Sequence, residues 1–198
     1  MDRLRVSDVS AHLQPEHGTL FTRRWFRWSA FAVAGALALA AGLHFRGNGD
    51  DAGGTGRGMD AATLFAIAMP DAAGNQQSFG QWQGRVLVVN FWATWCVPCR
   101  EEMPEFVKVQ RELGERGLQF VGVAIDQADK VEAFAAELGL NYPALIGGYG
   151  AIELSKTMGN RLGALPFTVI IDRSGRVVHT QLGPIKEAVL RTIVGQLL

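Results

Sequence analysis

The most informative stretch of the sequence is Phe91-Trp92-Ala93-Thr94-Trp95-Cys96-Val97-Pro98-Cys99-Arg100. It continues from Val86–Phe91, a nearly unbroken apolar run that is typical of a central strand covered on both faces. It leads into Arg100–Arg116, where apolar residues approximate one helical face and Pro104 is expected to kink the helix. The stretch therefore predicts a turn between a buried strand and a helix, with Cys96 at the helix N-terminus.

The two cysteines of this stretch are the only ones in the chain. A bridge between Cys96 and Cys99 closes a very short loop, so it stabilises little and is better interpreted as redox chemistry. At a helix N-terminus the free backbone N–H groups and the helix dipole favour a thiolate, which lowers the pKa of Cys96. We expect Cys96 to attack a partner disulfide and the less exposed Cys99 to resolve the mixed disulfide.

Two other interpretations of the cysteine pair are weaker. A purely structural bridge is one, and half of a zinc site is the other. Tetrahedral zinc needs two further ligands, and only His179 lies within the predicted folded module. The remaining histidines precede that module: His12, His17 and His44.

The rest of the apolar pattern predicts an α/β fold. Asp172–Gly175 carries a turn signal, so the strands on either side of it are expected to pair as an antiparallel hairpin. The order of elements predicts a mixed central sheet with helices on both faces. Strands are expected at Phe120–Ile125, Ala144–Ile146, Phe167–Ile171 and Val177–Leu182, and helices at Val131–Leu138, Ile152–Met158 and Pro184–Leu198.

Residues 28–45 contain no Asp, Glu, Lys or Arg and are rich in Ala and Leu, which predicts one transmembrane helix near the lower length limit. The arginines at 23, 24 and 27 place the preceding segment, residues 1–27, in the cytoplasm. A cleavable signal peptide is the alternative, since Ala36-Leu37-Ala38 resembles a cleavage site and Thr22–Phe26 a twin-arginine signal. Both interpretations place the C-terminal domain outside the cytoplasm.

Residues 46–58 are rich in Gly and lack a hydrophobic period, so they are expected to form a flexible linker to a folded domain at 59–198. The chain of 198 residues has 19 basic and 19 acidic side chains, and its formal net charge is zero. This balance argues against a nucleic-acid partner, because phosphate binding relies on clustered Lys and Arg.

Trp92–Cys99 resembles the active-site motif of the thioredoxin superfamily. The longer run Asn90–Cys99, followed by Glu102-Met103-Pro104, resembles the TlpA/ResA/CcmG-type branch of membrane-anchored bacterial thioredoxin-like proteins. Gly163–Thr168 resembles the loop that carries a cis-proline beside the active site in this family. The resemblance implies a thioredoxin-like fold, held on the bacterial cytoplasmic (inner) membrane with its catalytic domain in the periplasm.

The resemblance also implies roles for individual residues. Pro166 would be the cis-proline that shields the cysteine pair, although an ordinary trans turn proline is the alternative. Glu102 would assist proton movement, although the helix dipole alone favours an acid early in a helix. Trp92 would lie partly in the core. The implied catalytic residues are Cys96, Cys99, Glu102 and Pro166, and the implied client-contacting residues are Trp95, Val97, Pro98 and Leu165.

One position departs from the cytosolic thioredoxin pattern. Cytosolic thioredoxins carry a buried Asp where this chain has Asn90, and that Asp helps to deprotonate the resolving cysteine. Since an amide cannot act as a base, Glu102 or solvent would have to serve instead.

The expected function is reduction of cysteine pairs in specific client proteins, which by resemblance are apocytochromes c or copper-centre proteins of a terminal oxidase. The chain has no flavin or nicotinamide signature, so no cofactor is expected beyond the redox-active Cys96–Cys99 disulfide. Electrons would come from a DsbD- or CcdA-like membrane protein. Two alternatives stay open: an oxidase that forms disulfides, and a non-catalytic assembly factor that binds Cu(I) through two soft thiolates.

Overall fold

The computed structural model describes residues 61–198. The predicted cytoplasmic segment 1–27, the membrane span 28–45 and the linker 46–58 lie outside these residues. Between residues 61 and 198 no helix is long and apolar enough to cross a bilayer.

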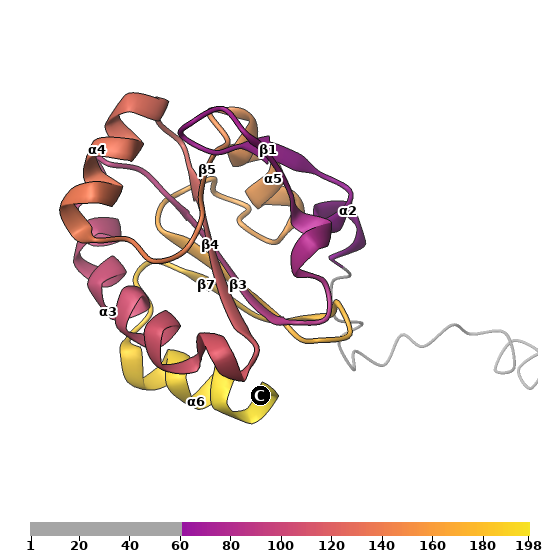
Figure 1. Ribbon diagram of the computed structural model, residues 1–198. Coiled ribbons are helices and arrows are strands. Elements are labelled where there is room, and N and C mark those ends of the chain that lie inside the picture. The colour runs from indigo at the N-terminus through magenta and orange to yellow at the C-terminus, as the bar shows by residue number, and fades with distance from the viewer. Residues whose placement is uncertain (1–60) are drawn as a thin grey trace, which may run out of the picture. The chain divides into compact units, whose positions relative to one another are not determined.

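The described chain begins with a small N-terminal unit and continues into alternating strands and helices (Figure 1). The N-terminal unit consists of helix α2 (Ala62–Phe65), strands β1 (Ala68–Pro70) and β2 (Gln76–Ser78), and a 3-10 turn at Phe79–Trp82. The main strands are β3 (Val86–Trp92), β4 (Leu118–Ala124), β5 (Ala144–Ile146), β6 (Phe167–Ile171) and β7 (Val177–Leu182). The main helices are α3 (Val97–Leu113), α4 (Ala128–Leu138), α5 (Gly150–Thr157) and α6 (Glu187–Leu197).

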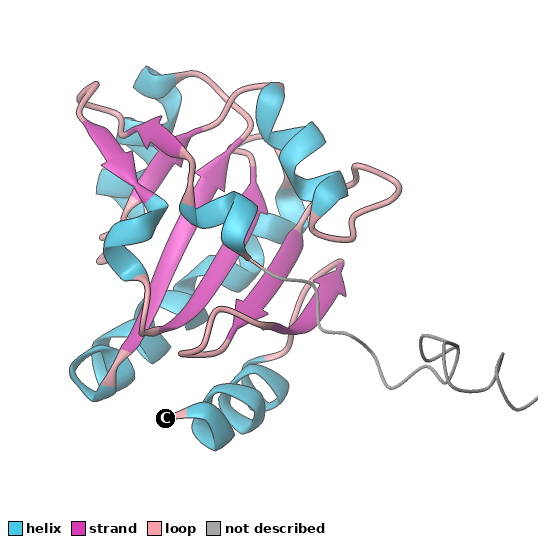
Figure 2. Cartoon of the chain, turned by 90° about the vertical axis from the view of Figure 1, so that its right-hand side faces the viewer, coloured by secondary structure: helices cyan, strands magenta, loops and turns pink. Residues whose placement is uncertain are grey.

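The central sheet has the strand order β5-β4-β3-β6-β7 (Figure 2). Strands β3, β4 and β5 are parallel, whereas β6 is antiparallel to β3 and β7 is antiparallel to β6. The sequence prediction of a mixed sheet with helices on both faces is therefore confirmed, and the arrangement is that of a thioredoxin-like α/β fold.

Helices cover both faces of the sheet, with α3, α4 and α6 on one side and α2 and α5 on the other (Figure 1). Successive side chains of a strand point to opposite faces, so a strand covered twice needs apolar residues at nearly every position. In β3, Val88 and Trp92 belong to the core under α3, and Leu87, Val89 and Phe91 belong to the core on the opposite face. This packing explains the nearly unbroken apolar run of β3, in which every residue, the polar Asn90 included, is buried.

Several element boundaries differ from the sequence prediction. The helix after the cysteine pair begins at Val97 rather than Arg100, because Pro98 fits a first helical turn, where no backbone N–H donor is required. It ends at Leu113, and a 3-10 turn follows at Gly114–Arg116. The prediction that Pro184 opens the last helix is wrong: α6 begins at Glu187, and Pro184 lies in the loop between β7 and α6.

Candidate active site

Cys96 and Cys99 form a disulfide with an S–S distance of 2.04 Å, so the structure describes the oxidised form. Cys96 is the N-cap residue of α3, and its backbone carbonyl accepts a hydrogen bond from the Arg100 N–H at 3.2 Å. Cys96 retains 6% of its surface exposed, whereas Cys99 is fully buried. This placement suits Cys96 to attack first, since it lies at the positive end of the helix dipole and is the more exposed of the two residues.

The turn before Cys96 is held by a carboxylate from the neighbouring strand end. Asp126, just beyond β4, accepts hydrogen bonds from the Thr94 hydroxyl and, at 3.2 Å, from the Thr94 N–H. Burial alone would raise the pKa of Asp126, but the hydrogen bonds from Thr94 and Gln127 outweigh it and hold the pKa below its usual value. Asp126 therefore stays ionised and fixes the turn between Ala93 and Cys96.

The Leu165–Pro166 peptide bond is cis, the conformation that the sequence resemblance implies. Phe167 pairs with Phe91 across the antiparallel β6–β3 ladder, so Leu165 and Pro166 lie beside the end of β3, where the chain turns toward Cys96. Leu165 packs against the core cluster that contains both cysteines. This placement is compatible with the client-binding role that the resemblance implies for Leu165.

The side chain of Asn160 fixes the loop that leads to Leu165. Its amide Nδ2 donates to the Ala164 carbonyl at 2.9 Å, and its Oδ1 accepts from the Ala164 N–H at 3.3 Å. Asn160 is buried, so the loop reaches the active site in a defined conformation.

Glu102 lies in α3, three residues after Cys99, and its side chain is buried. Its Oε1 accepts a hydrogen bond from Asn90 Nδ2 at 3.1 Å, and its Oε2 accepts one from the backbone N–H of Ile185 at 2.9 Å. Burial raises the pKa of Glu102 from 4.5 to about 7, because the two hydrogen bonds only partly offset the loss of solvation. Since residues three apart on a helix are neighbours, this carboxyl can exchange a proton near Cys99 at neutral pH.

Asn90 connects Glu102 to the sheet. Its Nδ2 also donates to Thr168 Oγ1 at 3.1 Å, so one amide bridges α3 and β6. The structure thus places Asn90 against Glu102, as a hydrogen-bond donor to the carboxyl and not as a base.

The aromatic and aliphatic residues of the cysteine motif have different positions. Trp92 is fully buried and packs against Phe134 with ring centroids 5.4 Å apart, which favours the core interpretation of Trp92. Trp95 is 66% exposed and Val97 62% exposed, although both are large apolar residues beside the reactive cysteine. Exposed apolar residues at such a position are available for contact with another protein.

Several residues of the site could not be found from the sequence. Asp126 directly follows the predicted strand Phe120–Ile125 and Thr168 lies in the predicted strand Phe167–Ile171, but neither position indicated a contact with the site, and nothing marked the Ile185 backbone. Tyr142 is also near the site: burial, and secondarily the charge of Glu102, raises its pKa above the usual range. These contacts join segments far apart in the chain, so no local sequence pattern predicts them.

Known proteins resemble this chain in both sequence and fold. The family model described as Redoxin matches residues 58–196. The thiol-disulfide oxidoreductase ResA of Halalkalibacterium halodurans is 29% identical over 83% of this chain and 89% of its own length. The thioredoxin-like protein YneN of Bacillus subtilis is 35% identical over 59% of this chain and 68% of its own length.

Solved structures give the same result. A thiol:disulfide interchange protein of the thioredoxin family from Chlorobium tepidum TLS superposes with a TM-score of 0.64 at 29% sequence identity. The match covers 71% of this chain and 97% of that protein. Fold and sequence thus point to the same group of proteins.

Proposed function

The chain belongs to the redoxin family as a thiol–disulfide oxidoreductase of the TlpA/ResA/CcmG type, and on this premise we propose that it reduces disulfides in periplasmic client proteins. The observation that carries the proposal is the placement of Cys96 and Cys99 at the start of α3, beside a buried carboxyl with a pKa of about 7.

The reaction begins from the dithiol form. The Cys96 thiolate attacks one sulfur of the client disulfide, a Cys96–client mixed disulfide forms, and the other client sulfur leaves and takes up a proton. Cys99 then loses its proton, and its thiolate attacks Cys96, which releases the second client sulfur as a thiol. Two electrons and two protons pass to the client, and Cys96–Cys99 becomes the disulfide.

The protein's own residues assist at three points. The N-terminus of α3 stabilises the Cys96 thiolate. Glu102 in its carboxylate form accepts the proton of Cys99, because its pKa lies close to neutral pH. Leu165 and Pro166 flank the cysteine pair where the client chain would lie.

The reduction potential of the Cys96–Cys99 couple tests the direction of electron flow. Equilibration of the full-length chain with glutathione buffers should give a value near that of thioredoxin, about −270 mV. A value near about −120 mV would instead identify an oxidase that forms disulfides.

The clients are proposed to be apocytochromes c or copper-centre proteins of a terminal oxidase, as the sequence resemblance implies. A Cys99→Ser variant cannot resolve the mixed disulfide, so it should accumulate a covalent adduct with the client through Cys96 in the native membrane. Mass spectrometry of the adduct names the client, and a Cys96→Ser variant is the control that should form none.

The reducing equivalents are proposed to come from a DsbD- or CcdA-like membrane protein, because the periplasm is oxidising. Residues 28–45 are proposed to anchor the chain in the inner membrane, with the catalytic domain in the periplasm. Protease added to spheroplasts should then digest the catalytic domain, whereas protection of that domain until lysis would overturn this location.

A further inference from the structure

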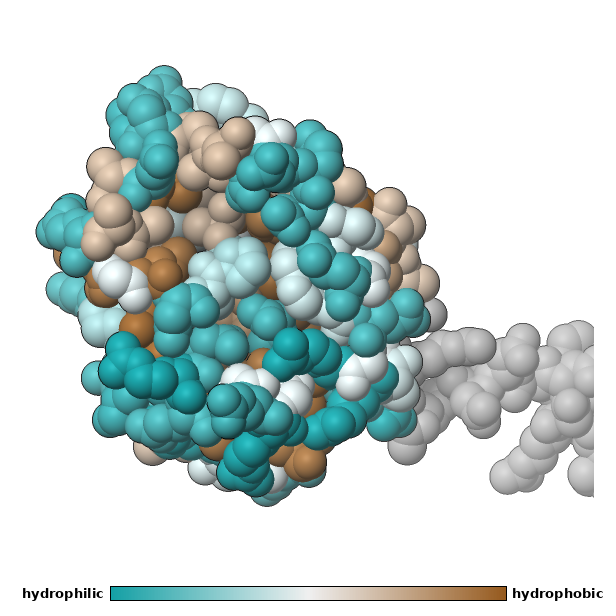
Figure 3. Space-filling view, in the orientation of Figure 1, coloured by the Kyte–Doolittle hydropathy of each residue, from teal (hydrophilic) through white to brown (hydrophobic). Residues whose placement is uncertain are grey.

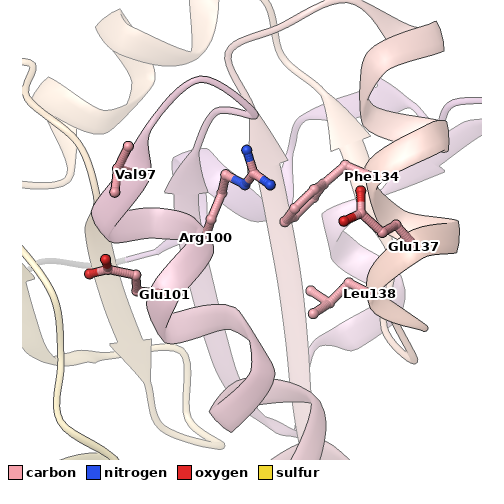
Figure 4. A pocket seen from close by; sticks show the side chains of 6 residues that line it. All are labelled: Val97, Arg100, Glu101, Phe134, Glu137 and Leu138. Carbon is pink, nitrogen blue, oxygen red and sulfur yellow. The ribbon is translucent and has the colours of Figure 1, made fainter.

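A groove runs between α3 and α4, lined by six residues (Figure 4): Val97, Arg100, Glu101, Phe134, Glu137 and Leu138. Its upper end lies at the start of α3, since Val97 directly follows Cys96. Figure 3 shows hydrophobic residues reaching the surface among hydrophilic ones where these two helices lie side by side. The groove therefore begins at the residue that follows the reactive cysteine and leads away from it along α3.

The groove lies on the opposite side of Cys96 from Pro166. In the sheet, β6, which Pro166 precedes, is one neighbour of β3, and β4 is the other. Helix α4 follows β4 and packs against β5, on that second side. A client chain that passes Leu165 on one side of its cysteine can therefore continue into the groove on the other side.

The lining combines an apolar surface with acidic side chains. The exposed side chain of Val97 and the half-buried side chain of Leu138 form its accessible apolar part, whereas Phe134 is only 9% exposed and lies at the bottom of the groove. The Arg100 guanidinium lies over the Phe134 ring, 5.1 Å from its centroid, and points from α3 toward α4 in Figure 4. This contact uses the ring face to stabilise the one basic group of the lining.

The two acidic groups of the lining, Glu101 on α3 and Glu137 on α4, come from different helices. Glu101 and Glu137 are exposed, and within the described part of the chain neither makes a salt bridge. The lining holds one basic group, Arg100, and two acidic groups, so it carries one net negative charge. A positively charged partner would be complementary to it.

We propose that this groove binds the client segment next to the attacked cysteine, and that it selects an apolar side chain followed by a basic one. The apolar side chain packs on Val97 and Leu138, next to the Arg100-covered ring of Phe134, and the Lys or Arg beyond it lies near Glu101 and Glu137. The proposal rests on the reductase function, and it adds a determinant of which disulfides are reduced.

Three synthetic peptides with one intramolecular disulfide each test the proposal against the reduced full-length chain. The first carries a leucine beside each cysteine and a lysine beyond each leucine; the second has glutamate in place of lysine, and the third has serine in place of leucine. The rate at which the protein reduces each peptide is divided by the rate at which dithiothreitol reduces the same peptide. This ratio corrects for the intrinsic reactivity of each peptide disulfide. The lysine peptide should react at least roughly threefold faster than the glutamate peptide, as expected for two exposed ion pairs, and the serine peptide should react more slowly than the leucine peptide.

The Glu101→Lys/Glu137→Lys variant should lose or reverse the preference for lysine. A matched control, Glu115→Lys/Glu132→Lys, makes the same charge change at two exposed positions outside the groove and should retain it. The preference of the wild-type chain should also fade in 1 M salt, where exposed charges are screened.

Three outcomes would overturn the proposal. One is equal normalised rates for the lysine and glutamate peptides while all peptides are reduced, which leaves the reductase function standing. Another is an equal effect of both double variants, which indicates net charge alone. The third is a change from dimer to monomer in the Glu101→Lys/Glu137→Lys variant, which assigns the groove to a second copy of the chain. If the dithiol form reduces no peptide at all, the reductase function fails and the groove proposal fails with it.

Discussion

The Glu102 carboxylate accepts a hydrogen bond from the backbone N–H of Ile185 at 2.9 Å, across 83 positions of the sequence. This contact ties α3 to the loop between β7 and α6, and it fixes a titratable group in the core near Cys99. Burial is the dominant influence on that group, because it raises the pKa of Glu102 to about 7 in spite of this hydrogen bond and the one from Asn90. Glu102 therefore links proton binding to both stability and redox chemistry.

The first prediction concerns the pH dependence of stability. Folding raises the pKa of Glu102 from 4.5 to about 7, so between these values the folded chain binds the proton that the unfolded chain has lost. Stability should therefore fall as pH rises from about 4.5 and level off above pH 7, with a contribution of roughly 3 kcal/mol. Glu102→Gln removes the titration. In urea unfolding of the oxidised forms, the free energy of unfolding of the variant should therefore rise relative to that of the wild type from pH 4.5 to 8.

Glu101→Gln is the control for this measurement, since Glu101 precedes Glu102 in α3 but is exposed. Its stability should follow the wild-type pH profile. Parallel profiles for wild type and Glu102→Gln would contradict the burial of an ionisable carboxyl at this position.

The second prediction concerns the rate of thiol–disulfide exchange. If Glu102 accepts the Cys99 proton, the rate of resolution in the wild type should rise through pH 7 as the carboxyl ionises. Glu102→Gln should lose this inflection, and its rate of resolution above pH 7 should be lower by roughly tenfold or more. Stopped-flow reduction of insulin between pH 6 and 9 provides the measurement, and an unchanged rate would leave Glu102 with a structural role only.

The third prediction follows from the contact between Asn90 and Glu102. In the wild type, Asn90 Nδ2 donates a hydrogen bond to Glu102 Oε1 at 3.1 Å. Asn90→Asp replaces this amide donor with a second carboxyl beside Glu102. Two carboxyls in contact resist losing both protons, so the inflection of the exchange rate should move above pH 7 and belong to the pair. Asn90→Ala removes the donor without adding a charge and should move it less; an inflection that stays in place in Asn90→Asp would show that the pair does not control the rate.

Features that arise from local sequence could be predicted, whereas features that need the folded chain could not. The strands β3, β4 and β6 were predictable because burial on both faces leaves nearly unbroken apolar runs, and the cysteine pair was predictable because its spacing is local. The short elements α2, β1 and β2 were not predicted, since the four residues of α2 are too few to show a helical period, and β1 and β2 are partly or fully exposed at every position. The equally short β5 was predicted, because its three residues are all apolar. The contacts of Glu102 with Ile185 and of Thr94 with Asp126 were also not predictable, because only the folded chain brings these segments together.

The fourth prediction concerns Trp95, which is 66% exposed and makes no ring contact with another aromatic residue of the described chain. Trp95→Ala should change the free energy of unfolding by no more than about 0.5 kcal/mol, as is usual for exposed side chains. If the indole contacts clients, reduction of a protein disulfide should slow by roughly fivefold or more. Reaction with dithiothreitol should keep its rate, and equal slowing of both reactions would point to the cysteines themselves instead.

The last prediction concerns Gly122 in β4, which lies beneath the Trp92 indole. A Cβ atom at Gly122 would come within 2.8 Å of Trp92 Nε1 and 3.6 Å of Tyr142 Cε2, and both rings are buried. Gly122→Ala should therefore displace Trp92 and cost roughly 1–3 kcal/mol of stability, as overpacked cores do.

Gly195→Ala is the matched control, because Gly195 lies in helix α6 and a Cβ atom there would meet nothing within 4 Å. It should stabilise the chain by about 0.5–1 kcal/mol, because a helix favours Ala over Gly. In urea unfolding, the free energy of unfolding should therefore fall in Gly122→Ala and rise in Gly195→Ala. A Gly122→Ala variant as stable as the wild type would mean that the Trp92 indole has room to shift.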